Sequence, residues 1–420
     1  MRNALGELRA RMPIPITILI APVLAATALS AAMAPSALAA PSPITIWVDV
    51  SRAATVSEFL KDGYQGHPVN VVTKELAAIK SELSTVPIDQ APDVIWADNT
   101  WTGDLAAAAL IVPLTLSPAK KALFAPNVLS GFQFGFDYYG IPVQYETWAL
   151  VTNAALAPKP PVTFAKLSTK ALALKAAGRA DVGLAVGQGV KGNAYFTYPL
   201  FSGLGGYVFG KDTSGSLNPF DVGVYNSVFR KNTKIIDDWN STGLINSSVD
   251  VVAAEAAFKA GRAPFWITGP WSASTLQALK FKYFISPVPR IDANLAMAPL
   301  LGIKGFMATS YAEAHGLGDV VPGLVVKKLS SSTFQSNMAA ISLRAPANKK
   351  STYSTSIGGR LAQAFGTAGV DGVPMPNIPQ ASSVWGPLST AWAKSTSGPG
   401  ATPAKKAFSA AQDEIQKAIG

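Results

Sequence analysis

Cysteine is absent from this chain of 420 residues. The absence excludes disulfide bonds, thiolate metal ligands and a lipid attached to an N-terminal cysteine. Stability must therefore come from packing, and the apolar share of 49% is sufficient for large cores. At this length two domains are expected rather than one.

Histidine is nearly absent as well, since only His67 and His315 occur. Neither stands in a recognisable catalytic setting, and no nucleophile elbow accompanies them, so the sequence argues against a serine hydrolase. No cluster of His, Asp and Glu has the spacing of a metal site. We therefore expect neither a metal nor a cofactor, and we expect both histidines to be loop or surface residues.

Charged residues are few, at 14%, and the formal net charge is +10. Low charge with abundant apolar residues argues against disorder. The lysines and arginines are scattered rather than grouped into a stripe, and no nucleic-acid-binding module is recognisable. The composition thus argues against a nucleic-acid partner. The excess of positive charge suits attraction to an anionic cell envelope, or simply solubility.

Long apolar runs are confined to the start of the chain. Arginines at positions 2, 9 and 11 precede an apolar stretch at 16–29, and Ala37-Leu38-Ala39 offers a small-residue cleavage site. A single membrane anchor is the alternative, but prolines interrupt the run and shorten its helical part. The pattern predicts a signal peptide over residues 1–39, with export to the periplasm or the extracellular face of the cell envelope.

The region that follows alternates between strand and helix patterns. Buried-strand patterns occur at 44–50, 69–73 and 93–96, and helical patterns at 55–63 and 103–109. Such alternation is typical of an α/β fold with parallel strands. Ligands of these folds bind beyond the carboxyl ends of the strands. The residues expected at that edge are Asp49, Ser51, Arg52, Asp98 and Trp101.

Tryptophans beside glycine, proline or polar residues are the most informative feature of the sequence. They end the segments Gly269-Pro270-Trp271 and Asp98-Asn99-Thr100-Trp101, and Trp385 follows the segment 375–380. We expect these rings on loops, because proline fixes φ and glycine frees it. Flat aromatic faces held on loops suit the apolar face of a sugar ring. The alternative is that they only fill space beneath the loops.

Several stretches together resemble the extracellular solute-binding proteins of carbohydrate ABC importers, most closely the maltose/maltodextrin-binding branch. The likeness spans nearly the whole chain after residue 40, and the segment 375–380 with Trp385 is its most specific part. The other stretches are Ile46-Trp47; 92–97 with Trp101 and Gly103; Ile141-Pro142-Val143 with Glu146, Leu150 and Asn153; 194–200 with Gly205-Gly206-Tyr207; and 255–258 leading to Gly269-Pro270-Trp271.

The resemblance implies a two-lobed α/β fold of the type II periplasmic-binding-protein class, with a ligand cleft between the lobes. Lobe one would comprise residues 40–144 plus 298–345, and lobe two residues 145–297 plus 346–420. It further implies a monomeric, non-enzymatic protein without a cofactor. Such a protein binds an oligosaccharide by closing about a hinge and delivers it to the membrane permease subunits.

The resemblance also assigns site residues. Glu146 matches a sugar-binding carboxylate, and Tyr195, Trp271 and Trp385 match stacking aromatics. We add Asp49, Arg52, Asp98 and Trp101 from their places at strand ends. For Arg52 and Asp98 loop solvation is an equal alternative, and for Trp101 so is packing of a helix on the sheet.

The sequence departs from the family's maltose binder at several of these positions. Ser51-Arg52 stands for an Asp-Lys pair, and Asp98-Asn99-Thr100 stands for His-Asp-Arg. Asn193 replaces the glutamate before the Tyr-Phe-Thr motif, and Gly386 replaces a tyrosine. Maltose or malto-oligosaccharides are the expected ligands, while chain length and linkage stay open.

Besides a non-transport role at the cell surface, such as adhesion, two rival functions remain from the sequence alone. One is a protein of the same fold that binds another solute, such as a different oligosaccharide or a peptide. The other is a secreted glycoside hydrolase, which needs two carboxylates on either side of the scissile bond. Glu146 could pair with Asp98 or Asp49 in that role, but no spacing in the sequence pairs them.

Overall fold

The computed structural model describes residues 41–295 and 297–420. The predicted signal peptide lies outside the described residues. Within the described part, every helix is too short or too polar to cross a membrane.

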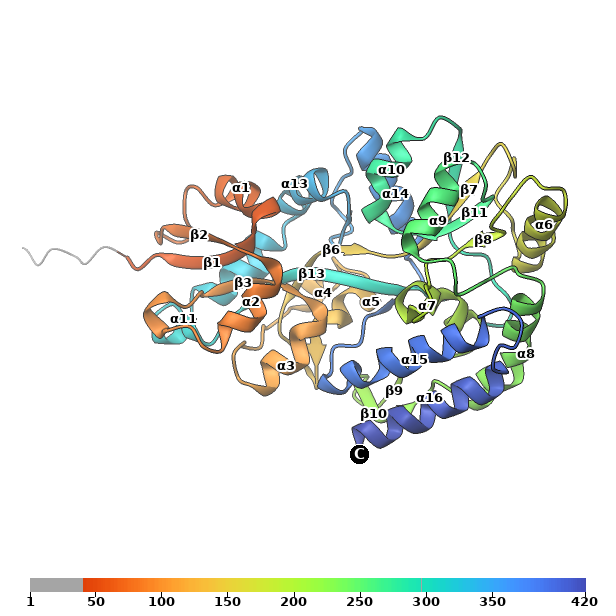
Figure 1. Cartoon of the computed structure of the whole chain (residues 1–420). Helices are drawn as coiled ribbons and strands as arrows, with labels where there is room; N and C mark the ends of the chain where they lie inside the picture. The colour runs from red at the N-terminus through yellow and green to blue at the C-terminus, as the bar shows by residue number, and fades with distance from the viewer. Residues whose placement is uncertain (1–40, 296) are drawn as a thin grey trace, which may run out of the picture. The chain divides into compact units, whose positions relative to one another are not determined.

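The first sheet is built from β1 (Ile44–Asp49), β2 (Val69–Lys74), β3 (Val94–Asp98), β6 (Ile141–Glu146), β13 (Leu300–Ala308), β14 (Ala345–Pro346) and β15 (Val373–Pro374). Its order is β14-β6-β13-β3-β1-β2, with β15 beside the start of β13. Figure 1 labels β6, β13, β3, β1 and β2 of this sheet. β1 is parallel to both β2 and β3, which confirms the predicted βαβ arrangement. β13 runs antiparallel to β3 and β6, so β3 and β6 point the same way.

The first helix begins earlier than its pattern predicts. It is α1 (Val50–Phe59), so Ser51 and Arg52 belong to its first turn and not to a loop. Asp49 is the reason, because its carboxylate accepts a hydrogen bond from the backbone N–H of Ser51 and caps the helix. α1 packs on the first sheet with α2 (Leu76–Leu83) and α13 (Ser332–Ser342).

The second sheet contains β7 (Ala149–Asn153), β8 (Leu184–Ala185), β11 (Phe265–Thr268) and β12 (Tyr283–Ser286), in the order β12-β7-β11-β8. Successive residues along each strand point to opposite faces of the sheet, and both faces are buried. Leu150, Phe265 and Ile267 join one core. Ala149, Val151 and Trp266 join another. Both faces of this sheet are therefore covered by helices.

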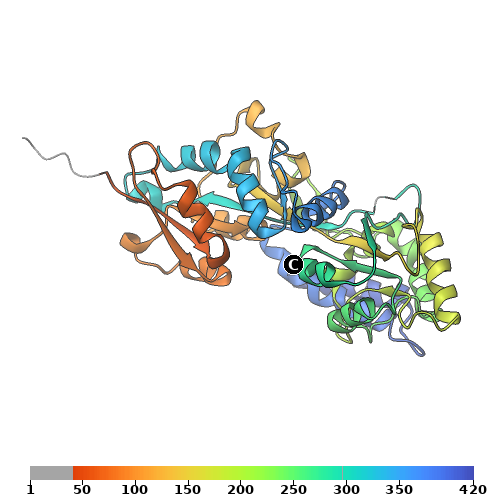
Figure 2. The ribbon, with the colours of Figure 1, turned by 90° about the horizontal axis from the view of Figure 1, so that it is seen from above.

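The first of these faces packs against α6 (Phe164–Ala176), α7 (Ala194–Gly203), α8 (Ser227–Ser241), α15 (Ser382–Ser395) and α16 (Ala404–Ile419). The second packs against α9 (Val251–Lys259), α10 (Ala273–Ala278) and α14 (Ile357–Ala368). α15 and α16 lie side by side along the side of the sheet that α7 covers (Figures 1 and 2). The C-terminal helices thus belong to the core of the second sheet.

The segment 373–377, which contains β15 and leads toward α15, is hydrogen-bonded to loops that flank the first sheet. The Asn377 amide donates to the carbonyls of Gly131 and Gln133 at 2.9 and 2.8 Å. The Asn99 amide donates to the Met375 carbonyl at 2.8 Å. Gly103 lies against Asn377 so closely that an added Cβ would stand 2.3 Å from its carbonyl oxygen.

Two hairpins and several short helices complete the described chain. The hairpins contact each other, since the Ser216 hydroxyl donates to the Gly135 carbonyl at 2.8 Å. The hairpin strands are β4 (Gln133–Phe134) with β5 (Asp137–Tyr138), and β9 (Phe209–Lys211) with β10 (Leu217–Val222). The short helices include α3 (Thr102–Ala107), α4 (Pro118–Lys121), α5 (Pro126–Leu129), α11 (Tyr311–Ala314) and α12 (Val321–Gly323), with a π-helical turn at Leu324–Leu329.

Candidate functional site

Three of the predicted acidic residues lie at one edge of the first sheet: Asp49 and Asp98, predicted from strand ends, and Glu146, predicted from the family resemblance. Asp49, Asp98 and Glu146 end β1, β3 and β6, and these three strands run in the same direction. β13 separates β6 from β3, with Gly302 opposite Glu146 and Lys304 opposite Asp98. The edge therefore carries a carboxylate on each of three strands.

Each of these carboxylates is held by a cation. Glu146 accepts from Arg344 Nε at 2.7 Å, Asp98 lies 2.5 Å from Lys304 Nζ, and Asp49 lies 2.8 Å from Arg52 Nη1. None of these six side chains is more than 25% exposed. The edge is thus charge-balanced, with fixed donors and acceptors that can bind the hydroxyls of a neutral ligand.

The sequence did not single out Lys304 or Arg344. They are separated from Asp98 and Glu146 by 206 and 198 residues, so no local spacing connects the partners. Their placement follows from the antiparallel register of β13 and from β14, which pairs Ala345 with Tyr145. Only the strand order reveals these two pairs.

Gln144 is a further polar residue in the same row of the sheet. It lies opposite Lys304, is 2% exposed, and its Oε1 has no hydrogen-bond partner among the described residues. Buried polar atoms nearly always have a partner. This oxygen can accept a hydrogen bond from a hydroxyl group, either of a ligand or of water.

Four aromatic rings form a cluster beside this edge. Trp148 packs edge-on against Tyr195 and Trp271, with ring centroids 3.8 and 5.8 Å apart. Phe196 also contacts these rings, at 5.8 Å from Trp271. Trp271 lies on a short 3-10 turn after Gly269-Pro270, as the sequence predicts. The structure therefore brings Tyr195 and Trp271 together, and it adds Trp148 and Phe196.

Tyr195 connects the aromatic cluster with the charged edge. It stands in the first turn of α7, which Asn193 caps through its side-chain oxygen. Burial, reinforced by the negative charges of Glu146 and Asp98, raises the pKa of the Tyr195 hydroxyl far above its usual value, and Arg344 opposes the rise. The phenol therefore stays neutral and can donate a hydrogen bond.

Trp385 lies on a helix, which corrects the prediction that it lies on a loop. It is in the first turn of α15, half-buried against the core that also packs Tyr195 and Trp271. One turn later on the same face, the Ser389 hydroxyl accepts from the Ala194 N–H of α7. Trp385 is thus close to the helix that carries Tyr195.

Trp101, Arg52 and Asp49 are engaged in local structure. Trp101 stands on a 3-10 turn after β3 and packs against the core of the first sheet. Arg52 lies over the buried Trp96 ring, 5.1 Å from its centroid. Asp49 is 7% exposed and caps α1. The polar groups of Arg52 and Asp49 bind mainly each other.

Within the described residues, no group of three or more His, Asp or Glu side chains is placed to hold a metal ion. The site can form hydrogen bonds through its three ion pairs, the Gln144 amide and the Tyr195 phenol, and indole and phenyl rings lie nearby. Such a mixture suits a ligand with polar edges and apolar faces.

Residues 51–314 match the family of bacterial extracellular solute-binding proteins. The chain belongs to this family. The match covers more than half of the chain, and it includes β13 with Lys304 as well as the strands that carry Asp98 and Glu146.

Individual relatives of this solute-binding protein are distant but extend over most of its length. The galactooligosaccharide-binding protein of Bacillus subtilis is 22% identical over 83% of each chain. The maltodextrin-binding protein MdxE of the same species is 26% identical over 76% of each chain. A crystal structure of a cyclo/maltodextrin-binding protein with maltotetraose has a TM-score of 0.78 at 22% identity, covering 90% of this chain and 97% of the other. The fold is therefore that of the type II solute-binding proteins, as expected.

Proposed function

We propose that this solute-binding protein is the substrate-binding component of an ABC sugar importer. It binds maltose or malto-oligosaccharides in a cleft between two lobes and delivers them to the permease subunits. The named relatives that bind maltodextrins support the ligand class. It acts as a monomer without a cofactor and does not alter its ligand.

One observation carries this proposal. Tyr195 lies on α7, which belongs to the core of the second sheet. The negative charges of Glu146 and Asp98, at the edge of the first sheet, contribute to the raised pKa of the Tyr195 hydroxyl. Polar groups of one sheet and aromatic rings of the other thus converge on one place. A sugar there is contacted from both sides, which stabilises the closed arrangement selectively.

The roles follow from the chemistry of each side chain. Glu146 and Asp98 accept hydrogen bonds from sugar hydroxyls, while Arg344 and Lys304 hold the two carboxylates and donate from their remaining N–H groups. Trp271, Tyr195 and Trp385 stack on the sugar faces. Trp101, Asp49 and Arg52 complete the set at the rim of the first sheet.

The lobe boundaries form part of the proposal. The core of the first sheet draws its buried residues from 44–143, 301–338 and Ala347, and the cores of the second sheet draw theirs from 148–300 and 361–415. Apart from Leu300, Ala347 and strand β15, this division supports lobe one as 40–144 plus 298–345 and lobe two as 145–297 plus 346–420. Export by a signal peptide over residues 1–39, without a lipid anchor, completes the picture.

A saccharide panel tests the ligand. The purified protein is titrated with maltose, maltotetraose and cellotetraose, and binding is followed by calorimetry and by thermal unfolding. A ligand at 100 times its dissociation constant adds about 2.7 kcal/mol to stability. We expect maltotetraose to bind and β-linked cellotetraose to fail. If no saccharide binds, the carbohydrate assignment is wrong.

Galacto-oligosaccharides are a second candidate ligand, because a galactooligosaccharide-binding relative matches over a similar share of the chain. They belong in the same panel, and the tighter ligand identifies the substrate. Incubation with maltotetraose followed by an assay for new reducing ends tests the absence of hydrolysis.

A further inference from the structure

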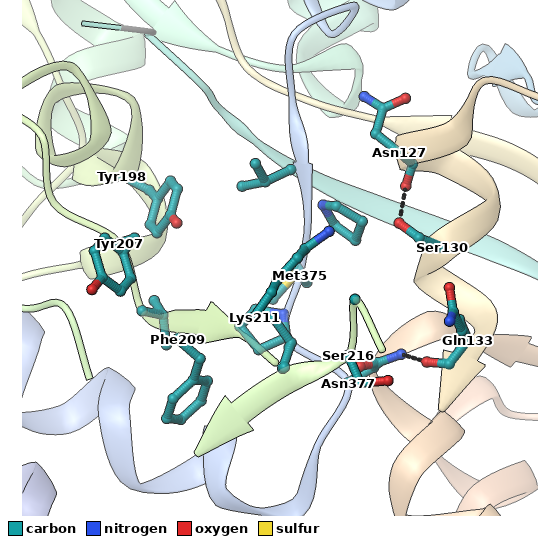
Figure 3. A pocket seen from close by; sticks show the side chains of 16 residues that line it. Asn127, Ser130, Gln133, Tyr198, Tyr207, Phe209, Lys211, Ser216, Met375 and Asn377 are labelled. Atoms are coloured by element: carbon teal, nitrogen blue, oxygen red, sulfur yellow. Dashed lines mark hydrogen bonds between the residues drawn. The ribbon is translucent and has the colours of Figure 1, made fainter. Parts of the chain in front are cut away.

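A cavity of about 180 Å³ is lined by residues other than those of the candidate sugar site (Figure 3). Asn127, Ser130 and Gln133 of the region from α5 to β4 form one wall. Tyr198 of α7 and residues of the stretch 207–217, which contains β9 and the turn leading to β10, form another. The segment 373–377 completes it. None of the predicted sugar-contact residues lines this cavity.

Rings and aliphatic side chains dominate the lining. Tyr198, Tyr207 and Phe209 contribute rings on one side, and Met375 faces the same space (Figure 3). An apolar cavity of about 150 Å³ is large enough to hold benzene. The cavity therefore fits one six-membered ring with a small substituent, and it is too small for an oligosaccharide. The remaining apolar lining residues are Val208, Leu217, Val373, Pro374 and Pro376.

The amide donors around the cavity are already used within the protein. Asn127 Nδ2 donates to the Gly372 carbonyl, and Asn377 Nδ2 donates to two carbonyls. Gln133 Nε2 donates to the Gly135 carbonyl at 3.1 Å. A ligand rich in hydroxyls would find few donors here. The cavity thus favours an apolar ring over a sugar.

The hydroxyl groups are largely engaged as well. The Tyr207 hydroxyl donates to Asp221 at 2.7 Å, and the Ser130 hydroxyl donates to the Asn127 carbonyl at 3.0 Å. Both bonds hold the walls in place. They leave little capacity for recognising a polar ligand.

Lys211 is the exception. It is the one charged residue of the lining, and its ammonium has neither an ion pair nor a hydrogen bond among the described residues. Asp221 engages Tyr207 instead, and no carboxylate lines the cavity. A single anionic group on the ligand would therefore meet an ammonium that lacks a protein partner.

We propose that this cavity is a second small-molecule site, which takes a single-ring aromatic carboxylate. The ring packs between the tyrosines, Phe209 and Met375, and the carboxylate pairs with Lys211. The site is distinct from the proposed sugar site, because it shares no lining residue with the candidate sugar contacts.

Benzoate is the probe, with benzyl alcohol as its neutral analogue. Binding to the full chain is measured by calorimetry and ligand-observed NMR, with and without saturating maltotetraose. We expect benzoate to bind saturably in both conditions. Lys211→Met should weaken benzoate about tenfold, by loss of a charge-assisted bond, and leave benzyl alcohol unchanged. The same change at Lys231, an exposed lysine of α8 outside the lining, should have no effect.

A second variant tests the location. Leu217→Trp places a larger side chain in the lining and should abolish binding of both probes while leaving the saccharide response intact. The proposal is overturned if benzoate does not bind, if Lys211→Met binds it as tightly as the unaltered chain, or if Leu217→Trp still binds it. Displacement of benzoate by maltotetraose that persists in Leu217→Trp would place the probe in the sugar site and also overturn the proposal. A failed saccharide titration leaves the benzoate result unaffected, so the two proposals fail separately.

Discussion

Lys304 of β13 places its ammonium 2.5 Å from the carboxylate of Asp98 at the end of β3, across a separation of 206 residues. The two residues face each other in the antiparallel register, and both side chains are less than one-fifth exposed. The pair holds Asp98 beside Tyr195, whose pKa responds to its charge. Long-range pairing thus builds the polar part of the candidate site.

Replacing the cation tests the importance of this pair. Lys304→Met should lower the free energy of unfolding by about 1–2 kcal/mol, between the values typical of exposed and buried pairs, because Asp98 would be left without its partner. Urea unfolding measures the change. Lys234→Met, which breaks an exposed pair on α8, should cost much less. Equal effects at the two positions would contradict the argument.

Removing an indole from the aromatic cluster should weaken sugar binding. Trp271→Ala is expected to reduce affinity for maltotetraose at least tenfold, because the ring's buried area and its stacking are both lost. Calorimetry measures the effect. Phe136→Ala removes a ring that is 82% exposed on the β4–β5 turn and should leave affinity unchanged. Unchanged affinity in Trp271→Ala would exclude the ring from the site.

The phenol of Tyr195 can be tested separately from its ring. Tyr195→Phe keeps the packing on Trp148 and removes only the hydroxyl, so stability should hold while sugar affinity falls about tenfold. Because the raised pKa keeps this phenol neutral, affinity should not change between pH 6 and 9 through its ionisation. Tyr225→Phe, at a half-buried tyrosine packed on the same core, serves as the control. A pH-dependent loss of affinity that disappears in Tyr195→Phe would refute the neutral phenol.

His315 should make stability depend on pH. Its ring nitrogens lie 2.7 Å from a carboxylate oxygen of Asp93 and 2.7 Å from the Ile88 carbonyl. Partial burial lowers the pKa of His315, but the bonds to Asp93 and Ile88, with the charges of Asp93 and Asp89, outweigh it and raise the pKa above 6.5. A raised folded-state pKa stabilises the fold fully below the unfolded pKa, and this stabilisation is lost as pH rises through the folded value.

The measurement is the urea midpoint from pH 5 to pH 9. The unaltered chain should lose stability as pH rises through the folded-state pKa of His315, and His315→Gln should lose this part of the dependence. His67→Gln, at the other histidine, controls for general effects. If His315→Gln retains the full pH dependence, another group is responsible.

Gly103 should not tolerate a side chain. An added Cβ would stand 2.3 Å from the Asn377 carbonyl oxygen. The segment that carries Asn377 is held in place by two hydrogen bonds that its side-chain amide donates. Gly103→Ala is expected to cost about 1–3 kcal/mol, the range of overpacked sites. Gly183→Ala meets its nearest neighbour, a flexible lysine chain, at 3.3 Å and should cost less. Thermal unfolding of both variants distinguishes them, and similar melting temperatures would show that the Asn377 segment can shift.

The sequence by itself determined a good part of this protein. The alternation of strand and helix patterns predicted the parallel pairing of β1 with β2 and β3, because local periodicity reports which face of each element is buried. Strand-end positions predicted that Asp49 and Asp98 share an edge, since parallel strands bring their carboxyl ends together. The motif with Gly269-Pro270 predicted the turn that presents Trp271.

Only the tertiary structure decided the partners of these residues. Arg344, Lys304 and Gln144 join the site through the register of β13 and β14. Trp385 is helical because the turn at Pro379–Ala381 leads directly into α15. The adjacent Gly386 and Pro387 suggest a loop in the sequence, yet both lie within this helix. Short-range patterns carry information about burial and turns, whereas the choice of a partner some 200 residues away depends on strand order, which no local pattern encodes.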